Sequence, residues 1–202
     1  MSIKRMQWLL AVLLLAAVSA KADSITVNGS FAFADHGVGI PPYGGTLNGH
    51  DASFYCVDFG HQISGNTGWT ATATSLVSAS GYNNTYLQNQ TTYLEMAWLI
   101  TQMLGTSNQT LQAQYQWAIW YLSVGSNLNL VKDPYTKDVF WAAAAATAVL
   151  QNHFTVSGWE ILTPDPKGSY GQEFIVVGAP ESSSLLLLGI GLISLVGLGR
   201  RK

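Results

Sequence analysis

Residues 91–122 read TTYLEMAWLITQMLGTSNQTLQAQYQWAIWYL, and their pattern decides how the rest of the chain is interpreted. In the first half, Leu94, Trp98 and Thr101 fall on one helical stripe. That stripe ends at Gly105, a residue type that commonly follows the last turn of a helix. A helix over residues 91–104 is therefore predicted.

Two further helices are predicted after it. Asn108 or Thr110 can cap a second helix that runs through Leu122, since short polar side chains accept hydrogen bonds from the first turn. Asp133 and Pro134 open a third, over residues 135–152, around an alanine run. Together these segments predict a helical subdomain of about three helices.

The segments on either side of the helices favour β-structure. Predicted strands cover residues 25–27, 30–33, 52–59, 69–76, 154–162 and 172–177, and Asn28-Gly29 is typical of a hairpin turn. Residues 36–50 are rich in glycine and proline and predict a loop. The expected fold class is α+β, in which a β-rich subdomain bearing the Cys56 strand carries an inserted helical subdomain.

The N-terminus is typical of a secretory signal peptide. Lys4 and Arg5 precede an apolar run, and Ala20-Lys21-Ala22 supplies small residues for cleavage before Asp23. The apolar run is shorter than the about 20 residues of a membrane span. Residues 1–22 are therefore predicted to be removed on export.

Residues 179–202 form a second terminal signal. Pro180 and Glu181 precede an apolar stretch over residues 185–198, predicted to be a C-terminal transmembrane helix, and Arg200-Arg201-Lys202 form a basic tail. These parts resemble the PEP-CTERM sorting signal of Gram-negative bacteria, although Ser182 replaces its usual second proline. The resemblance implies processing by an exosortase, anchoring in the membrane by the C-terminal helix, and delivery to the cell surface or an exopolysaccharide matrix.

The domain between the signals, residues 23–178, is acidic. It holds three lysines, no arginine and ten acidic residues, for a formal charge near −7. Phosphate backbones are bound by clustered lysine and arginine, so nucleic-acid binding is excluded. One domain with a substantial core is expected from this length.

The chain contains one cysteine, Cys56, which cannot form a disulfide within the chain. Unprotected, an exported thiol would oxidise. Gln116 lies in Tyr115-Gln116-Trp117-Ala118-Ile119-Trp120, on a predicted helix. If a cysteine and a glutamine are held together in a protected site, the thiol can displace ammonia and form an internal thioester, because fixed geometry lowers the barrier by about 7–11 kcal/mol.

The elements Tyr55-Cys56-Val57 and Gln116-Trp117-Ala118-Ile119-Trp120 resemble the two signatures of the thioester domains of bacterial surface adhesins. The resemblance implies a bond between the Cys56 sulfur and the Gln116 side-chain carbonyl carbon. It also implies single-use acyl transfer to an amine, most simply a lysine of a partner or matrix protein, and a role in adhesion without enzymatic turnover. Large side chains are expected to shield the bond from water: Tyr55, Tyr115, Trp117, Ile119 and Trp120.

Other interpretations of the same residues remain. A cysteine hydrolase would use Cys56 with His61 or His153 and an acid such as Asp58, but no known spacing relates them. The four histidines are widely separated, so neither a metal nor another cofactor is predicted. A non-covalent structural or carbohydrate-binding matrix protein would share the export signals, with sugars stacked on exposed aromatics such as Trp69, Tyr82, Tyr86 or Trp159.

Overall fold

The computed structural model describes residues 22–63, 65–78, 80–124 and 137–178. Its strands are β1 (Asp23–Val27), β2 (Phe33–Asp35), β3 (Val38–Ile40), β4 (Tyr43–Leu47), β5 (His50–Cys56), β6 (Thr67–Ser75), β7 (Glu160–Pro164) and β8 (Phe174–Val176). Its helices are the 3₁₀ turn η1 (Tyr82–Asn84), α2 (Gln90–Leu104), α3 (Gln109–Val124) and α4 (Asp138–Leu150).

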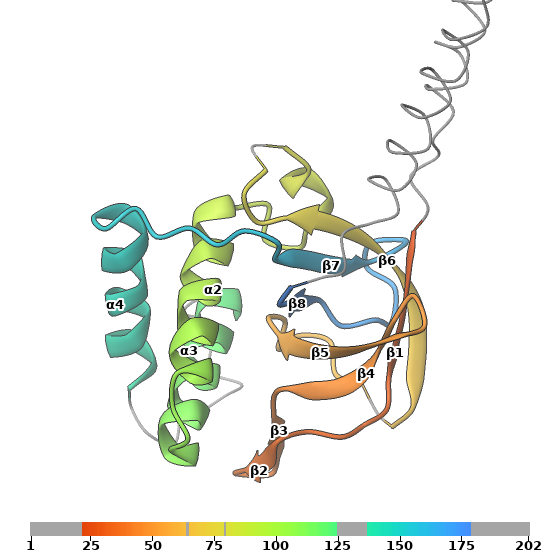
Figure 1. Ribbon diagram of the computed structural model, residues 1–202, viewed down its shortest axis with the longest axis horizontal. Coiled ribbons are helices and arrows are strands. Elements are labelled where there is room, and N and C mark those ends of the chain that lie inside the picture. The colour runs from red at the N-terminus through yellow and green to blue at the C-terminus, as the bar shows by residue number, and fades with distance from the viewer. Residues whose placement is uncertain (1–21, 64, 79, 125–136, 179–202) are drawn as a thin grey trace, which may run out of the picture.

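Six strands close into a barrel in the order β1-β4-β5-β8-β7-β6, with every neighbouring pair antiparallel. The closing contact joins β1 to β6, with Asp23 opposite Ala71 and Val27 opposite Thr67. β2 and β3 form a separate two-stranded hairpin. Figure 1 shows the three α-helices side by side on one flank of the barrel, with α4 farthest from the strands.

Alternation along the strands creates two cores. Phe54 and Cys56 of β5 point into the barrel with Phe174 of β8, while Tyr55 and Ile175 point outward onto the helices. α2 and α4 pack their apolar faces into the outer core. α3 contributes to both cores, because its ring of apolar residues meets the barrel on one side and the other helices on the other. This helix therefore lies where the cores meet.

A buried carboxyl ties the barrel to the helices. Glu173 has no exposed surface, and its oxygens accept hydrogen bonds from Thr163 Oγ1 at 2.6 Å, from the Tyr86 backbone N–H at 3.0 Å and from the Tyr93 hydroxyl. Burial raises the pKa of Glu173, although these donors act in the opposite direction. The cluster fixes the start of β8 against α2.

The predicted fold class is wrong in its β-portion, because the strands close into a barrel that the α+β prediction did not contain. The error begins in the glycine-rich residues 36–50, predicted to be a loop, which supply β3 and β4. Position 45 of β4 requires glycine, because a Cβ there would approach the Thr26 carbonyl oxygen to 2.0 Å. The absence of a side chain at Gly45 lets β4 pair closely with β1. The hairpin predicted at Asn28-Gly29 is also absent, because β1 pairs with β4 and β6 and not with the strand that follows the turn.

The predicted C-terminal transmembrane helix is also corrected. Within the described residues, no helix has the length and apolar character needed to cross a bilayer. The helices there have 15, 16 and 13 residues, short of the about 20 that a span requires. Residues 185–198, on which that prediction falls, lie outside the described residues, as do residues 1–21 of the predicted signal peptide.

Candidate functional site

Cys56 is the last residue of β5 and is completely buried inside the barrel. The strand period places its side chain on the barrel face with Phe54, and the backbone leaves the sheet immediately afterwards. The residue is a free thiol in this structure. Its position at the end of a strand brings it beneath α3.

Gln116 reaches the same point from the middle of α3. Its side chain is completely buried, and its Nε2 donates a hydrogen bond to the Cys56 backbone oxygen at 2.9 Å, across 60 positions of sequence. Its Oε1 is buried and has no hydrogen-bond partner among the described residues. Leaving such an acceptor unpaired costs about 1–3 kcal/mol. The fold thus holds this carboxamide against the cysteine with its acyl oxygen unsatisfied.

The Cys56 sulfur is contacted by three polar groups. The Trp120 indole N–H donates to Sγ at 3.2 Å, and Gln172 Nε2 donates to it at 2.9 Å. The thiol itself donates to the Asp58 carbonyl oxygen at 3.2 Å, and Gln172 Nε2 also donates to that oxygen at 2.7 Å. The sulfur therefore has defined polar contacts, on a residue whose backbone oxygen accepts a hydrogen bond from Gln116.

Burial raises the pKa of the Cys56 thiol to about 12. The hydrogen bonds from Trp120 and to the Asp58 carbonyl lower this pKa, whereas the negative charges of Asp58 and Glu173 raise it further. The thiol is consequently protonated at neutral pH. This is the opposite of the lowered pKa that a nucleophilic catalytic cysteine requires.

The aromatic residues expected around the site divide between the two cores. Trp117 and Trp120 lie in the barrel core with Cys56, their rings 5.1 Å apart and nearly perpendicular. Tyr55, Tyr115 and Ile119 lie in the outer core, on the other side of the β5 and α3 backbones. The structure therefore places both tryptophans in the core that holds the sulfur, with Trp120 in contact with it, and the other three residues in the outer core.

A pocket of about 350 Å³ opens beside Trp120. Its lining includes Phe31, Tyr43, Phe59, Trp120 and Gln172, with glycines 29, 37, 39 and 65. The Phe59 ring lies 4.9 Å from that of Trp120. Because Trp120 and Gln172 both touch Sγ and also line the pocket, the pocket ends one side chain away from the sulfur.

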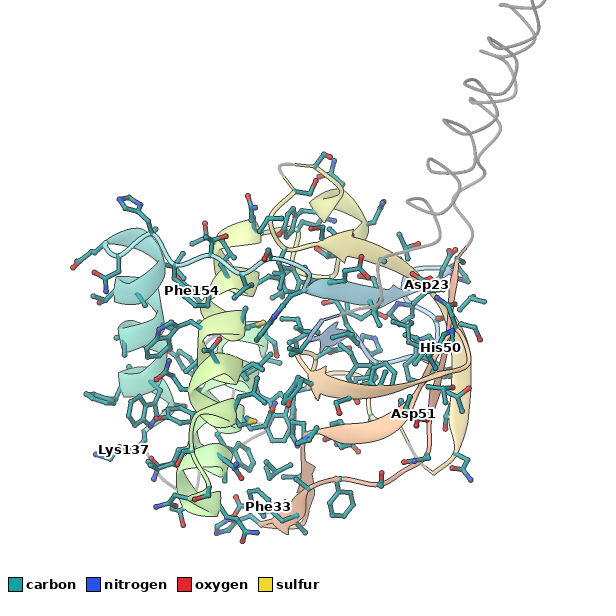
Figure 2. All side chains as sticks on the ribbon, viewed as in Figure 1. Asp23, Phe33, His50, Asp51, Lys137 and Phe154 are labelled. Atoms are coloured by element: carbon teal, nitrogen blue, oxygen red, sulfur yellow. The ribbon has the colours of Figure 1, made fainter. Side chains whose placement is uncertain are left out.

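Neither histidine of the hydrolase interpretation contacts the sulfur. His61 Nδ1 lies 2.6 Å from Asp58 Oδ2, and the His61 ring stacks on Tyr86 at 4.9 Å. His153 is exposed just after α4. Among the described residues, no group of three or more histidine, cysteine, aspartate or glutamate side chains could hold a metal ion. Figure 2 shows His50 and Asp51 on the barrel side away from the helices.

Sequence interpretation missed two residues of this site. Gln172 was placed only at the start of a predicted strand, and Phe59 only at the end of another. Neither has a local signal, because each reaches the sulfur or the pocket through a change of chain direction outside the regular strands. The sorting-signal residues Pro180, Glu181, Arg200 and Arg201 lie outside the described residues.

Comparison of the chain with protein-family models, with curated proteins and with solved structures finds no match.

Proposed function

We propose that Cys56 and Gln116 form an internal thioester and that the protein uses it once, to bind an amine-bearing partner covalently. The observation that supports this is the fully buried Gln116 carboxamide, whose Nε2 donates to the Cys56 backbone oxygen and whose Oε1 has no partner in the described part of the chain. An inert core cysteine would not require a buried glutamine beside it.

Formation of the bond is a balanced displacement. The Cys56 sulfur attacks Gln116 Cδ, the Cδ–Nε2 bond breaks, and the thiol proton leaves with the nitrogen as ammonia. Fixing the two groups on β5 and α3 supplies effective molarity in place of a catalyst. The reaction also removes a strongly polar amide from a buried site and leaves a thioester carbonyl, which is a weaker acceptor. The unsatisfied Oε1 therefore costs less after the bond forms.

Gln116 Oε1, the acyl oxygen of the proposed thioester, accepts no hydrogen bond from a donor among the described residues. In an enzyme, such donors stabilise the oxyanion and speed attack by any nucleophile, including water. Without them, weak nucleophiles such as water react slowly, whereas an amine is nucleophilic enough to attack unaided. A thioester carbonyl without hydrogen-bond donors would hydrolyse slowly and still react with an amine, as a single-use electrophile requires.

The partner we propose is a protein or matrix molecule that presents a primary amine, most simply a lysine. Self-capture by the described lysines is disfavoured, since neither lines the pocket. Lys167 Nζ donates to the Thr85 carbonyl at 2.6 Å and to the Asn83 carbonyl at 3.3 Å. Lys137 lies at the start of α4, on the side of the helices turned away from the barrel (Figure 2).

The proposal includes the resemblance to the thioester domains of surface adhesins and the export that the two terminal signals imply, with exosortase processing at Pro180-Glu181. Adhesion at the cell surface or in an extracellular matrix follows from these two parts together. The partner's identity would be set by which amine reaches the pocket.

A non-covalent, carbohydrate-binding matrix protein is the second candidate, because aromatic residues line the pocket. The aromatic residues first considered for sugar stacking are not equally well placed to contact a sugar. Tyr82 is buried in the outer core, and Trp69 stacks on Phe174 at 5.8 Å. Phe31, which is 47% exposed, and Phe59 are better placed to meet a ligand.

Methylamine distinguishes the two candidates. The covalent function predicts that the exported form takes up one methylamine at Gln116 and releases one titratable thiol at Cys56. Cys56→Ala and Gln116→Ala should take up none, whereas Gln109→Ala, an exposed glutamine at the start of the same helix, should behave as wild type. A wild-type protein with a free thiol and no uptake would favour the non-covalent candidate.

A further inference from the structure

We propose that Gln172 and Trp120 are catalytic residues of the acyl transfer, which stabilise the Cys56 sulfur as it leaves when an amine opens the thioester. The inference rests on the proposed function and adds a chemical role for the two side chains that touch the sulfur. Trp120 was expected only to shield the bond, and Gln172 was not anticipated at all.

Both contacts have their direction fixed by chemistry. An indole Nε1–H is a donor only, so Trp120 must donate to Sγ. A backbone carbonyl oxygen is an acceptor only, so the Gln172 side chain must turn its nitrogen toward Asp58 O, 2.7 Å away. The second hydrogen on that nitrogen is then free to donate to Sγ at 2.9 Å. Two N–H groups therefore point at the sulfur.

These donors face the atom that acquires charge in the reaction. The amine nitrogen attacks Gln116 Cδ, the Cδ–Sγ bond breaks, and its electron pair stays on Sγ. A proton from the attacking nitrogen is transferred to Sγ, which leaves a substituted amide at Gln116 and a thiol at Cys56. Hydrogen bonds to an ionised group are stronger than those to a neutral one. The two contacts therefore strengthen as the bond breaks, which is how a group accelerates a reaction.

Departure of the sulfur is the step at which this help counts. A tetrahedral intermediate expels its less basic group more readily, and a lysine amine has a pKa of about 10.4. Burial raises the pKa of the Cys56 thiol, which makes its sulfur a poor leaving group, and the hydrogen bond from Trp120 acts against that rise. The acyl oxygen has no donor among the described residues. The hydrogen-bond donors of the site therefore stabilise the leaving sulfur and not the acyl oxygen.

Trp120 and Gln172 also shield the sulfur from the pocket. Trp120 and Gln172 line it as well as touching Sγ, so they separate the sulfur from the space through which solvent and partner arrive. The same two side chains shield the thioester before the reaction and solvate the thiolate during it. A purely apolar wall would provide only the first of these effects.

The test compares Gln172→Leu, Gln172→Glu and Trp120→Phe with two controls, Gln109→Leu and Trp141→Phe. Trp141 donates its indole N–H to Gln114 Oε1 at 3.2 Å, so its replacement removes a similar bond elsewhere. Thiol release by methylamine should slow about ten- to a hundredfold in Gln172→Leu and Trp120→Phe. It should slow more in Gln172→Glu, whose carboxylate cannot donate and repels a thiolate. The controls should match wild type.

A second measurement applies even where a variant fails to form the thioester. In the Gln116→Ala background the thiol is free, and its alkylation rate as a function of pH reports its ionisation. Adding Gln172→Leu or Trp120→Phe should move that profile to higher pH, a shift that loss of packing alone would not give. Unchanged release rates, or an unchanged profile, would overturn this inference. Absence of any thioester in the wild-type protein would instead overturn the proposed function.

Discussion

Trp117 Nε1 donates a hydrogen bond to Asp35 Oδ2 at 3.1 Å and so ties α3 to the β2–β3 hairpin. Residues Val38 and Gly39 of that hairpin line the pocket, and α3 carries Gln116 and Trp120. One wall of the pocket is therefore held to the helix that bears Gln116. The contact explains how a small hairpin outside the barrel can protect its interior.

Asp35→Ala should loosen this wall. The Asp35 side chain is 14% exposed and also lies 3.1 Å from His36 Nδ1, so its loss should cost about 1 kcal/mol of stability. Water should then reach the thioester more often, and the stored protein should convert several-fold faster to the form with glutamate at position 116. Mass spectrometry over days at neutral pH measures this. An unchanged conversion rate would show that the hairpin does not guard the site.

Phe59→Ala should have a larger effect of the same kind. The Phe59 ring packs on Trp120 at 4.9 Å and on Trp117 at 6.3 Å, and it lines the pocket. Because the side chain is half-buried, truncation should destabilise the fold by about 1–2 kcal/mol. The thioester should hydrolyse faster than in Asp35→Ala. Phe140→Ala, at an exposed position on α4, is the matched control and should leave the thioester lifetime unchanged.

Glu173 predicts a pH dependence of stability. Since burial raises its pKa above the ordinary value of 4.5, the folded protein keeps a proton that the unfolded chain releases. The contribution is fully present below pH 4.5 and is lost as pH rises through the folded pKa. Glu173→Gln, which preserves shape and cannot ionise, should lose less stability than wild type between pH 5 and pH 8. Parallel urea unfolding curves at each pH provide the measurement, and identical losses would refute the assignment.

His61→Ala separates acyl capture from hydrolysis. The histidine contacts Asp58 and Tyr86 and does not contact the sulfur. Methylamine uptake should therefore continue within a few-fold of the wild-type rate. A cysteine hydrolase would lose its activity on this substitution. If the variant folds and takes up no methylamine, His61 takes part in the reaction and this interpretation is wrong.

The helices were the part of the structure that local sequence predicts well. The predicted helix over residues 91–104 corresponds to α2 at Gln90–Leu104, and Asn108 does cap α3, accepting from the Leu111 N–H at 3.2 Å. Both succeed because stripes and caps are local properties. Barrel closure is not local, since the paired residues of β1 and β6 are 40 to 48 positions apart, and the need for glycine at Gly45 comes from the Thr26 backbone of another strand.

The candidate site divides in the same way. The proximity of Cys56 and Gln116 was expected from resemblance to a family, whereas Tyr55, expected to shield the bond, faces the other core because side chains alternate along β5. The polar contacts of the sulfur were not predictable. Gln172 is 116 positions from Cys56 and reaches it only because β8 pairs with β5.

The proposed covalent bond between Cys56 and Gln116 is tested most directly by the intact mass of the domain over residues 23–178. A thioester predicts a mass one ammonia below that of the sequence, a deficit absent from Cys56→Ala and Gln116→Ala and present in Gln109→Ala. Peptides containing residues 56 and 116 should be recovered linked. A wild-type protein of full mass, with a thiol that titrates after denaturation, would contradict it.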